Sequence, residues 1–405
     1  MSPDVCVRLR SLVGSHAVEL DTQGIPHVSP DSAEGVALVC RLAHEEGLTI
    51  RLEGRGTWLQ PDAEADVVLS TRALDQITDI SPADLLATVQ AGTPFETLQR
   101  RVADHGMWLA LDPPGRPDRS IGSIVASATA GPLQSGLGPV RDHVLGATVV
   151  AGDGRVLTSG GRVVKNVAGY DLTKLHVGGF GGFGVITEMH LRLRTRPNVD
   201  TTLTACGTRD ALAFAARTLI ETGARYSALE LLSPAVAAHA EWTLAARLLG
   251  TESSVRSSVR RLHDTTELTW HELPAGESST LWGLVSRAWM GGPVTLRLGA
   301  LVDGLDDTID LLAAVLDEEL VAAGAAMGGI RWAGSATPDQ LLTLRHRAAE
   351  REIPVTLERA PWAVRRRIGH FGAYREGVGG VVRRLRKTFD QHHCFRVALE
   401  EDEDA

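Results

Sequence analysis

Small residues crowd one part of this 405-residue chain, and they restrict its fold more than any other feature. Glycine occurs 42 times, which is about 10% of the chain against a usual share near 7%, and the surplus falls between positions 115 and 184. Residues 121–138 read IGSIVASATAGPLQSGLG. Because such side chains are too small to fill an ordinary core, we expect their backbone to lie against an extended ligand or another backbone.

Two glycine runs can be tested as nucleotide sites. Residues 179–184 (GFGGFG) match the letters GxGxxG, but a strand-like segment at 185–194 follows them where the dinucleotide fingerprint requires a helix. Residues 54–56 (GRG) fail for the same reason, and no GxxxxGK[ST] sequence is present. We therefore reject a Rossmann or P-loop site. Turns with several free N–H groups can still bind a diphosphate without a helix terminus.

Strand and helix signals alternate along the rest of the chain, which predicts a mixture of helices and sheets. An Asp-Gly turn between 144–150 and 155–157 predicts a hairpin. We place a domain boundary after residues 196–198, which read RPN. The other predicted strands are 49–52, 66–70, 86–91, 201–206, 226–232 and 294–301, and the predicted helices are 30–47, 93–105, 172–175, 210–222 and 305–323.

Length, charge and cysteine content exclude several classes of protein. One core rarely exceeds about 250–300 residues, so we expect two domains. Acidic residues outnumber basic ones by 50 to 41, a net charge of −9, which argues against nucleic acid or anionic lipid as the main partner. The four cysteines are scattered and form no CxxC pattern, so we expect no iron–sulfur cluster, no structural metal and a cytoplasmic location. We expect neither a signal peptide nor a membrane span.

Three motifs carry a family resemblance. Residues 161–172 read GRVVKNVAGYDL, residues 179–188 read GFGGFGVITE, and residues 140–146 read VRDHVLG. Residues 25–197 thereby resemble the FAD-binding domain of the vanillyl-alcohol oxidase or p-cresol methylhydroxylase (PCMH) type, and the motifs are similar to those of the FAD-binding (E) subunits of bacterial glycolate oxidases. The resemblance implies an α+β fold. It comprises a PCMH-type two-subdomain FAD-binding domain (1–198), a smaller α/β cap or substrate domain (199–375), and a C-terminal helix with an acidic tail (376–405).

The resemblance also implies which residues contact FAD. The first glycine-rich turn would hold the diphosphate through its amides, the middle tract would line the cofactor from ribose to ring, and the last glycine run would contact the adenine or the flavin. Covalent members carry a His in the first turn; residues 54–58 contain none, so non-covalent FAD is implied. The implied cofactor-binding residues are Gly54, Arg55, Gly56, Thr57, Trp58, Pro114, Ser120, Ile121, Gly122, Ser123, Ser127, Thr129, Ala130, Gly131, Gly181, Gly184, Val185 and Ile186.

The implied function is that of an FAD-binding oxidoreductase subunit that handles electrons from oxidation of a 2-hydroxy acid of the glycolate or D-lactate class. A sister flavoprotein subunit and an iron–sulfur subunit are implied as partners, which could hold the chain at the inner face of the membrane. The family's His/Gly/Asn-rich catalytic motif has no counterpart, and the closing Asn-Pro-Gly-Arg is missing after the FDQHHCF at 389–395. We therefore assign no catalytic residue. The alternative is a non-catalytic FAD-holding subunit that stabilises a catalytic sister flavoprotein.

Several further residues have two interpretations each. In the second half, an arginine could pair bidentately with a substrate carboxylate near the flavin. We interpret Lys165 and Asn166 as structural, and Tyr170 and Asp171 as a helix cap. His392, His393 and the basic run 381–387 are interpreted as surface residues near a C-terminal helix. The candidates for facing the flavin are Arg331, Trp332, Glu358, Arg359 and Trp362.

Overall fold

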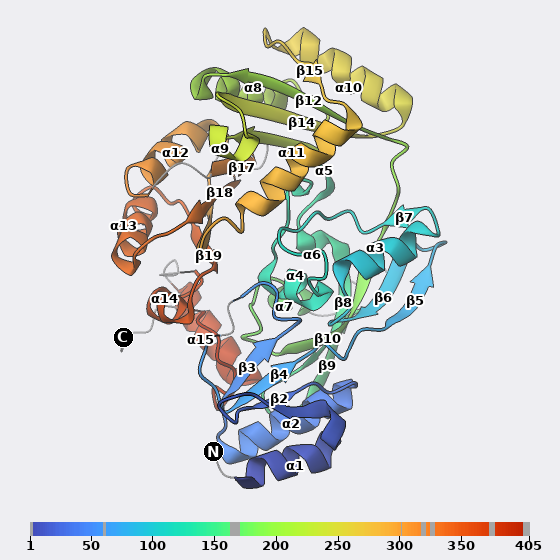
Figure 1. The fold of residues 1–405 in the computed structure, drawn as a ribbon, viewed down its shortest axis with the longest axis vertical. Helices are drawn as coiled ribbons and strands as arrows, with labels where there is room; N and C mark the ends of the chain where they lie inside the picture. Colours follow the sequence, from blue (N-terminus) through green and yellow to red (C-terminus); the bar gives the residue numbers. More distant parts are fainter. Residues whose placement is uncertain are drawn as a thin grey trace.

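The structure, a computed structural model, describes residues 3–59, 62–162, 171–300, 302–316, 321–324, 329–371 and 377–399. Its strands form three sheets of four, five and eight strands and one short two-stranded pair. The four- and five-stranded sheets come from the first half of the chain. The eight-stranded sheet, here called the cap sheet, lies at the opposite end of the long axis from α1 and α2 (Figure 1). This mixed architecture confirms the predicted α+β fold.

The four-stranded sheet has the order β1-β2-β4-β3, in which β4 runs parallel to both β2 and β3. Helix α2 begins after Ser32, whose side chain accepts a hydrogen bond from the Gly35 amide, and ends at the left-handed Gly47. The predicted end at Gly47 is confirmed, whereas the predicted start at Pro30 lies too early because Ser32 is the capping residue. The elements are α1 (Pro3–Val13), η1 (Ser15–Ala17), β1 (Val18–Leu20), β2 (Pro26–Val28), α2 (Ala33–Glu46), β3 (Ile50–Glu53) and β4 (Val67–Ser70).

The five-stranded sheet has the order β5-β6-β10-β8-β9 and is antiparallel throughout. Strands β8 and β9 form the hairpin that the Asp-Gly turn predicts. Strand β10 follows the glycine run 179–184 directly, which confirms the rejection of a Rossmann turn. The elements are β5 (Ile77–Ser81), β6 (Leu86–Gln90), α3 (Phe95–Ala103), β7 (Met107–Trp108), α6 (Val140–His143), β8 (Val144–Val150), β9 (Val156–Gly160), α7 (Thr173–His176), β10 (Val185–Arg192) and β11 (Arg194–Thr195).

The small-residue tract folds differently from the expectation. It forms the helices α4 (Ile121–Ser127) and α5 (Gln134–Leu137). Ile121, Ile124 and Val125 of α4 are buried against the five-stranded sheet, so the tract contributes to a core that it shares with other segments. The alternative of backbone contact is confirmed at Gly122, where an added Cβ would lie 2.8 Å from both the Cβ and the carbonyl oxygen of Ala91.

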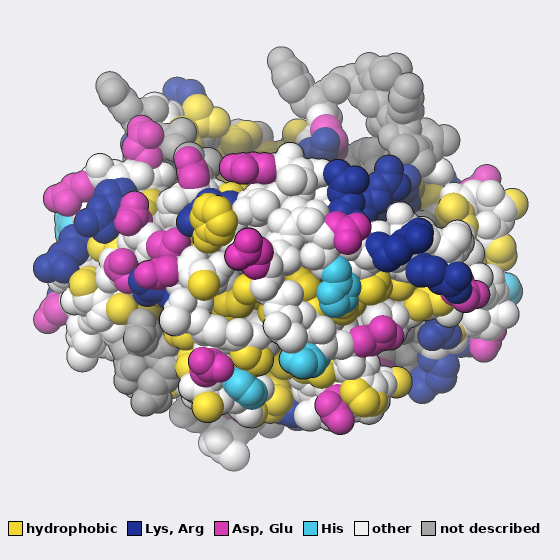
Figure 2. Space-filling view, turned by 90° about the horizontal axis from the view of Figure 1, so that it is seen from above, with side chains coloured by type: hydrophobic (Ala, Val, Ile, Leu, Met, Phe, Trp, Pro, Cys, Tyr) yellow, Lys and Arg dark blue, Asp and Glu magenta, His cyan; other side chains and the backbone are white. Residues whose placement is uncertain are grey.

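The cap sheet has the order β15-β12-β14-β13-β17-β18-β16-β19, and its strands are antiparallel. Helices α8, α10, α12 and α13 share a hydrophobic core with one face, and α9 and α11 pack on the other. Seen from above, acidic and basic side chains are both scattered over this end of the molecule (Figure 2). The elements are β12 (Val199–Gly207), α8 (Arg209–Glu221), β13 (Ala228–Leu232), α9 (Pro234–Ala237), β14 (Trp242–Gly250), α10 (Glu252–Thr265), β15 (His271–Glu272), α11 (Ala275–Ala288), β16 (Val294–Gly299), η2 (Val302–Gly304), α12 (Leu305–Ala313), β17 (Val321–Gly324), β18 (Gly329–Gly334), α13 (Pro338–Ala349) and β19 (Val355–Arg359).

One predicted helix is wrong in its second half. The Ala- and Leu-rich stretch 305–323 predicts a single helix, but α12 ends at Ala313 and residues 321–324 form β17. Strand β17 pairs with β13 on one side and β18 on the other. Two neighbouring strands therefore override the helical preference of alanine, because sheet pairing and burial outweigh propensity.

The end of the described chain returns to the first sheet. After α14 (Trp362–Ile368) and α15 (Val378–Phe389), Phe395 forms a parallel bridge with Ile50 of β3. The Ile50 amide donates to the Cys394 carbonyl at 2.6 Å, and the Arg396 amide donates to the Ile50 carbonyl at 2.8 Å. No helix among the described residues is long and apolar enough to cross a membrane.

Candidate cofactor site

A cavity lies where the first sheet, α4, the second glycine run and the C-terminal segment meet. All three side-chain-poor segments contribute to its wall. The predicted residues that line it are Gly54, Arg55, Gly56, Thr57, Trp58, Gly122, Ser123, Ser127, Gly181, Gly184, Val185 and Ile186.

The other predicted residues do not line the cavity, and Ser120 supports the wall from behind. The Ser120 side chain accepts a hydrogen bond from the Ser123 amide and so caps α4. Its Oγ would lie only 2.4 Å from a Cβ added to Gly54, so Gly54 permits the first turn to approach α4. The residues outside the cavity lining are Pro114, Ser120, Ile121, Thr129, Ala130 and Gly131.

Four residues from beyond the cap sheet line the cavity and were not predicted: Arg365, His370, Arg396 and Val397. The His370 ring stacks on Phe180 with 3.7 Å between centroids, and its Nδ1 lies 2.7 Å from the Leu357 carbonyl oxygen. Burial lowers the pKa of His370 to about 3, so this ring is neutral at physiological pH. The closing FDQHHCF segment was the one sequence signal for this wall, since it precedes Arg396 directly.

The polar groups of the wall fit an anionic dinucleotide. The Trp58 Nε1 and the Arg51 Nε are buried donors without a partner among the described residues, and both residues line the cavity. Buried donors are usually hydrogen-bonded in folded proteins, so these two N–H groups are available to an acceptor that a ligand carries. The diphosphate of FAD supplies such acceptors. The donor set therefore fits FAD.

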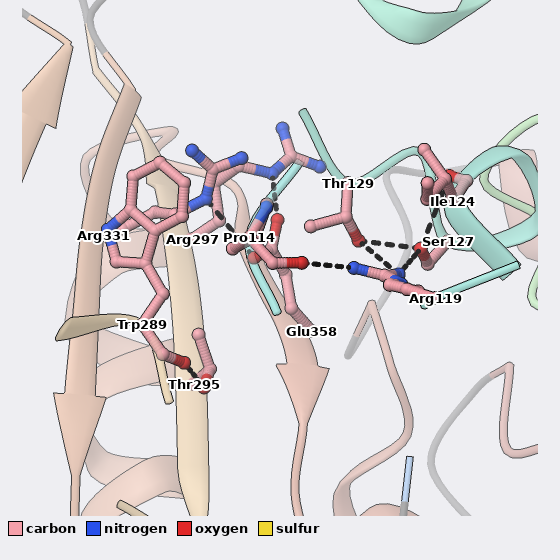
Figure 3. Close-up of polar contacts among 10 residues, drawn as sticks. All are labelled: Pro114, Arg119, Ile124, Ser127, Thr129, Trp289, Thr295, Arg297, Arg331 and Glu358. Atoms are coloured by element: carbon pink, nitrogen blue, oxygen red, sulfur yellow. Dashed lines mark hydrogen bonds and ion pairs between the residues drawn. The ribbon is translucent and has the colours of Figure 1, made fainter. Parts of the chain in front are cut away.

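A second polar group lies where the cap sheet faces the N-terminal half (Figure 3). The Glu358 carboxylate, 1% exposed, accepts hydrogen bonds from the Arg297 Nε at 3.0 Å and the Arg331 Nε at 3.2 Å. The Arg331 guanidinium also lies 4.3 Å from the centroid of the Trp289 ring. Burial would raise the pKa of Glu358, but the two guanidinium groups outweigh burial and lower it. The two arginines therefore share the single negative charge of Glu358, and Arg297 is also in contact with solvent at 38% exposure.

Two more carboxyl groups lie in this region, of which Asp112 is half-buried and Glu230 is buried. Asp112 accepts a hydrogen bond from the Leu133 amide at 3.2 Å, and Glu230 on β13 is 4% exposed. Burial raises the pKa of Asp112 to about 7 and that of Glu230 to about 8. Because each value lies near or above neutral pH, both groups hold a proton for much of the physiological range.

The remaining flavin-facing candidates have structural contacts. Trp332 is part of the cap core, the Arg359 Nη1 donates to the Gly292 carbonyl at 2.6 Å, and the Trp362 amide donates to the Asp62 carboxylate at 2.5 Å. His392 is exposed and stacks on His44. Within the described ranges, no three His, Cys, Asp or Glu side chains form a metal site. Lys165, Asn166 and Tyr170 lie outside the described residues.

Comparison with known proteins agrees with this geometry. A family model described as an FAD binding domain matches residues 27–160. Glycolate oxidase subunit GlcE of Escherichia coli is 38% identical over 136 residues, 33% of this chain and 39% of that protein. Glycolate oxidase subunit GlcD of Bacillus subtilis is 31% identical over 199 residues, 48% of this chain and 42% of that protein. The chain thus aligns with less than half the length of either relative.

The fold also matches solved structures. A 4-ethylphenol oxidase from Gulosibacter chungangensis superposes with a TM-score of 0.72 at 14% identity, covering 96% of this chain and 95% of that one. A p-cresol methylhydroxylase superposes with a TM-score of 0.71 at 13% identity, covering 96% and 94%. At such identities the likeness shows the fold alone. The chain therefore carries an FAD binding domain and has the fold of the PCMH-type flavoproteins.

Proposed function

We propose that this chain is an FAD-binding oxidoreductase subunit that holds FAD non-covalently and handles electrons from the oxidation of a 2-hydroxy acid of the glycolate or D-lactate class. The observation that carries the proposal is the cavity wall, in which three side-chain-poor segments meet and two buried donors lack acceptors. The names of the relatives support the substrate class, since they include glycolate oxidase subunits and a D-lactate dehydrogenase of Saccharomyces cerevisiae.

Each part of the wall has a proposed task. The turn at 54–58, with the Trp58 and Arg51 donors, would bind the diphosphate. The neutral His370–Phe180 stack would exclude water from one side of the cavity and pack against a ring. When bound, FAD supplies the electron-accepting chemistry, and the protein supplies binding, orientation and electrostatics. The attachment is non-covalent in this proposal because the turn at 54–58 contains no His.

The proposal includes partners and a location. The two relatives named as glycolate oxidase subunits support a sister flavoprotein subunit. We add an iron–sulfur subunit as the electron outlet, because the described residues contain no cluster of metal-ligating side chains. All four cysteines are free thiols, which supports a reducing, cytoplasmic environment; contact with the inner face of the membrane would then come through the partners.

One observation favours a second candidate, a non-catalytic subunit that holds FAD and stabilises a catalytic sister flavoprotein. A substrate carboxylate would need an unpaired arginine near the flavin. Arg331 and Arg297 already pair with the internal carboxylate of Glu358. This pairing removes Arg297 and Arg331 as free partners for a 2-hydroxy acid.

Flavin binding and reduction separate these possibilities. Apoprotein incubated with FAD and desalted should retain the visible flavin absorbance; a colourless protein would refute both candidates. Glycolate or D-lactate is then added to the holoprotein without oxygen, with acetate as the control ligand. Bleaching by the isolated chain supports the catalytic subunit. Bleaching only after the sister flavoprotein is added supports the non-catalytic one.

A further inference from the structure

Arg119 is a buried cation that no part of the proposed function uses. Arg119 is only 1% exposed. The Nη1 donates to the Pro114 carbonyl at 3.0 Å, and the Nη2 donates to the Ser127 Oγ at 2.7 Å. The Nε donates to the Ser123 Oγ at 3.2 Å. Every one of these acceptors is neutral.

The charge of Arg119 has no matching anion nearby. Among the described residues Arg119 forms no ion pair. Glu358 attracts it across the gap between the cap sheet and α4, but Glu358 is hydrogen-bonded to Arg297 and Arg331 (Figure 3). The single negative charge of Glu358 is therefore already shared by two arginines and does not balance the charge of Arg119. Burying a charge without a counter-charge is costly, which calls for an explanation beyond packing.

Arg119 lies directly behind the cavity wall. Its guanidinium carbon is 3.9 Å from the centroid of the Trp58 ring, and its hydrogen-bond partners include Ser123 and Ser127. All three of these neighbours line the cavity. The Trp58 Nε1 is the same buried donor that lacks an acceptor. An uncompensated positive charge and an unpaired N–H thus meet at one part of the wall.

We propose that Arg119 and the Trp58 indole N–H form the diphosphate-recognising part of the cavity, with Arg119 acting as a positioning residue behind Trp58. Trp58 would donate to a phosphate oxygen, while the buried guanidinium supplies the positive potential that favours the anion. This inference rests on the proposed FAD site and deepens it. It also explains why the cation is retained, since a bound diphosphate would supply the counter-charge that the apoprotein lacks.

The test measures for which part of the dinucleotide each variant loses affinity. Apoprotein of the wild type and of Arg119→Gln, Arg119→Lys and Trp58→Phe is titrated with FAD and with riboflavin, which has no phosphate; ADP is measured by competition. The matched control is Arg116→Gln, in the same loop, because Arg116 is 68% exposed and pairs with Asp118. Circular dichroism of each apoprotein verifies folding.

Arg119→Gln should weaken FAD and ADP binding about tenfold or more, as expected for losing one nearby charge in a partly desolvated site. It should leave riboflavin within about twofold of the wild type. Arg119→Lys should restore most of the FAD affinity, and Arg116→Gln should match the wild type. Trp58→Phe keeps an aromatic ring and leaves Arg119 in place but removes the indole N–H. It should weaken FAD and ADP binding by a smaller factor, and it tests the proposal even if Arg119→Gln fails to fold.

Three results would overturn the inference. The first is a folded Arg119→Gln variant that binds FAD and ADP as the wild type does. The second is a loss of FAD affinity with unchanged ADP affinity, which would assign the charge to the isoalloxazine ring instead. The third is unchanged FAD and ADP binding by Trp58→Phe. A wild-type protein that binds no FAD would reject the proposed function itself, so the two failures are distinguishable.

Discussion

Replacement of Glu358 by Gln should destabilise the cap sheet strongly. The Glu358 side chain is 1% exposed and that of Arg331 is 5% exposed, so the change leaves the Arg331 guanidinium buried without its carboxylate. Breaking a buried ion pair from one side costs about 3–5 kcal/mol. Arg297 adds little to this figure, because its side chain is 38% exposed and water screens its charge. We therefore expect the free energy of unfolding to fall by about 3 kcal/mol.

The assay is equilibrium urea unfolding followed by tryptophan fluorescence, which reports on the cap through Trp289 and Trp332. Glu350→Gln is the matched control because Glu350 is exposed at the end of α13. A double variant, Glu358→Leu with Arg331→Met, should recover most of the lost stability, since apolar groups can replace a buried pair. If Glu358→Gln stays within about 0.5 kcal/mol of the wild type, the range of a surface substitution, the reasoning is refuted.

Three further predictions concern the cavity, the buried acids and the glycine contacts. Arg396→Gln should weaken FAD binding about threefold to tenfold in a fluorescence titration, because this exposed guanidinium lines the cavity without an ion pair among the described residues. Thermal stability should decrease as the pH rises from about 4 to about 8. The folded-state pKa values of Asp112 and Glu230, about 7 and about 8, exceed the ordinary values of 3.8 and 4.5. The stability that these two groups contribute is therefore fully present below the ordinary pKa values and is lost as the pH rises through the folded-state values. Gly122→Ala should cost about 1–3 kcal/mol in urea unfolding, because its Cβ would meet Ala91 at 2.8 Å.

Each of these predictions has a control and a contrary outcome. Arg384→Gln removes an exposed charge from α15 outside the cavity, so equal FAD affinities for the Arg384 and Arg396 variants would contradict the assigned role. Asp112→Asn with Glu230→Gln should flatten the pH dependence, and an unchanged slope would contradict the burial argument. Gly276→Ala adds a Cβ that meets nothing within 4 Å. It should be neutral, and a loss matching that of Gly122→Ala would disprove the contact explanation.

Sequence patterns predicted those parts of the fold that depend on interactions between residues close together in the chain. The Asp-Gly turn predicted the β8–β9 hairpin, in which Val150 pairs with Val156, since a short turn sets the register of its own strands. The strand after 179–184 excluded a Rossmann turn because the order of elements is itself local. The helix α4 was missed, since small residues predict close approach but do not specify that the approaching backbone is helical.

The unpredicted half of the site depends on contacts between distant positions. Arg396 reaches the cavity only because Phe395 pairs with Ile50, and nothing in either segment indicates that pairing. Likewise, Arg119 stands in a polar loop (PGRPDRS at 114–120), where an arginine is ordinarily a surface residue. Its burial follows from contacts with Trp58 and with α4, which the sequence alone does not reveal.

The central claim is that the three side-chain-poor segments together enclose a dinucleotide, and a crystal structure of the FAD-loaded protein tests it most directly. The account predicts diphosphate density against the turn at 54–58, within hydrogen-bond distance of the Trp58 Nε1, and cofactor contacts from α4 and the 181–186 run. Density located elsewhere, or a Trp58 Nε1 paired with a protein group while FAD is bound, would contradict it.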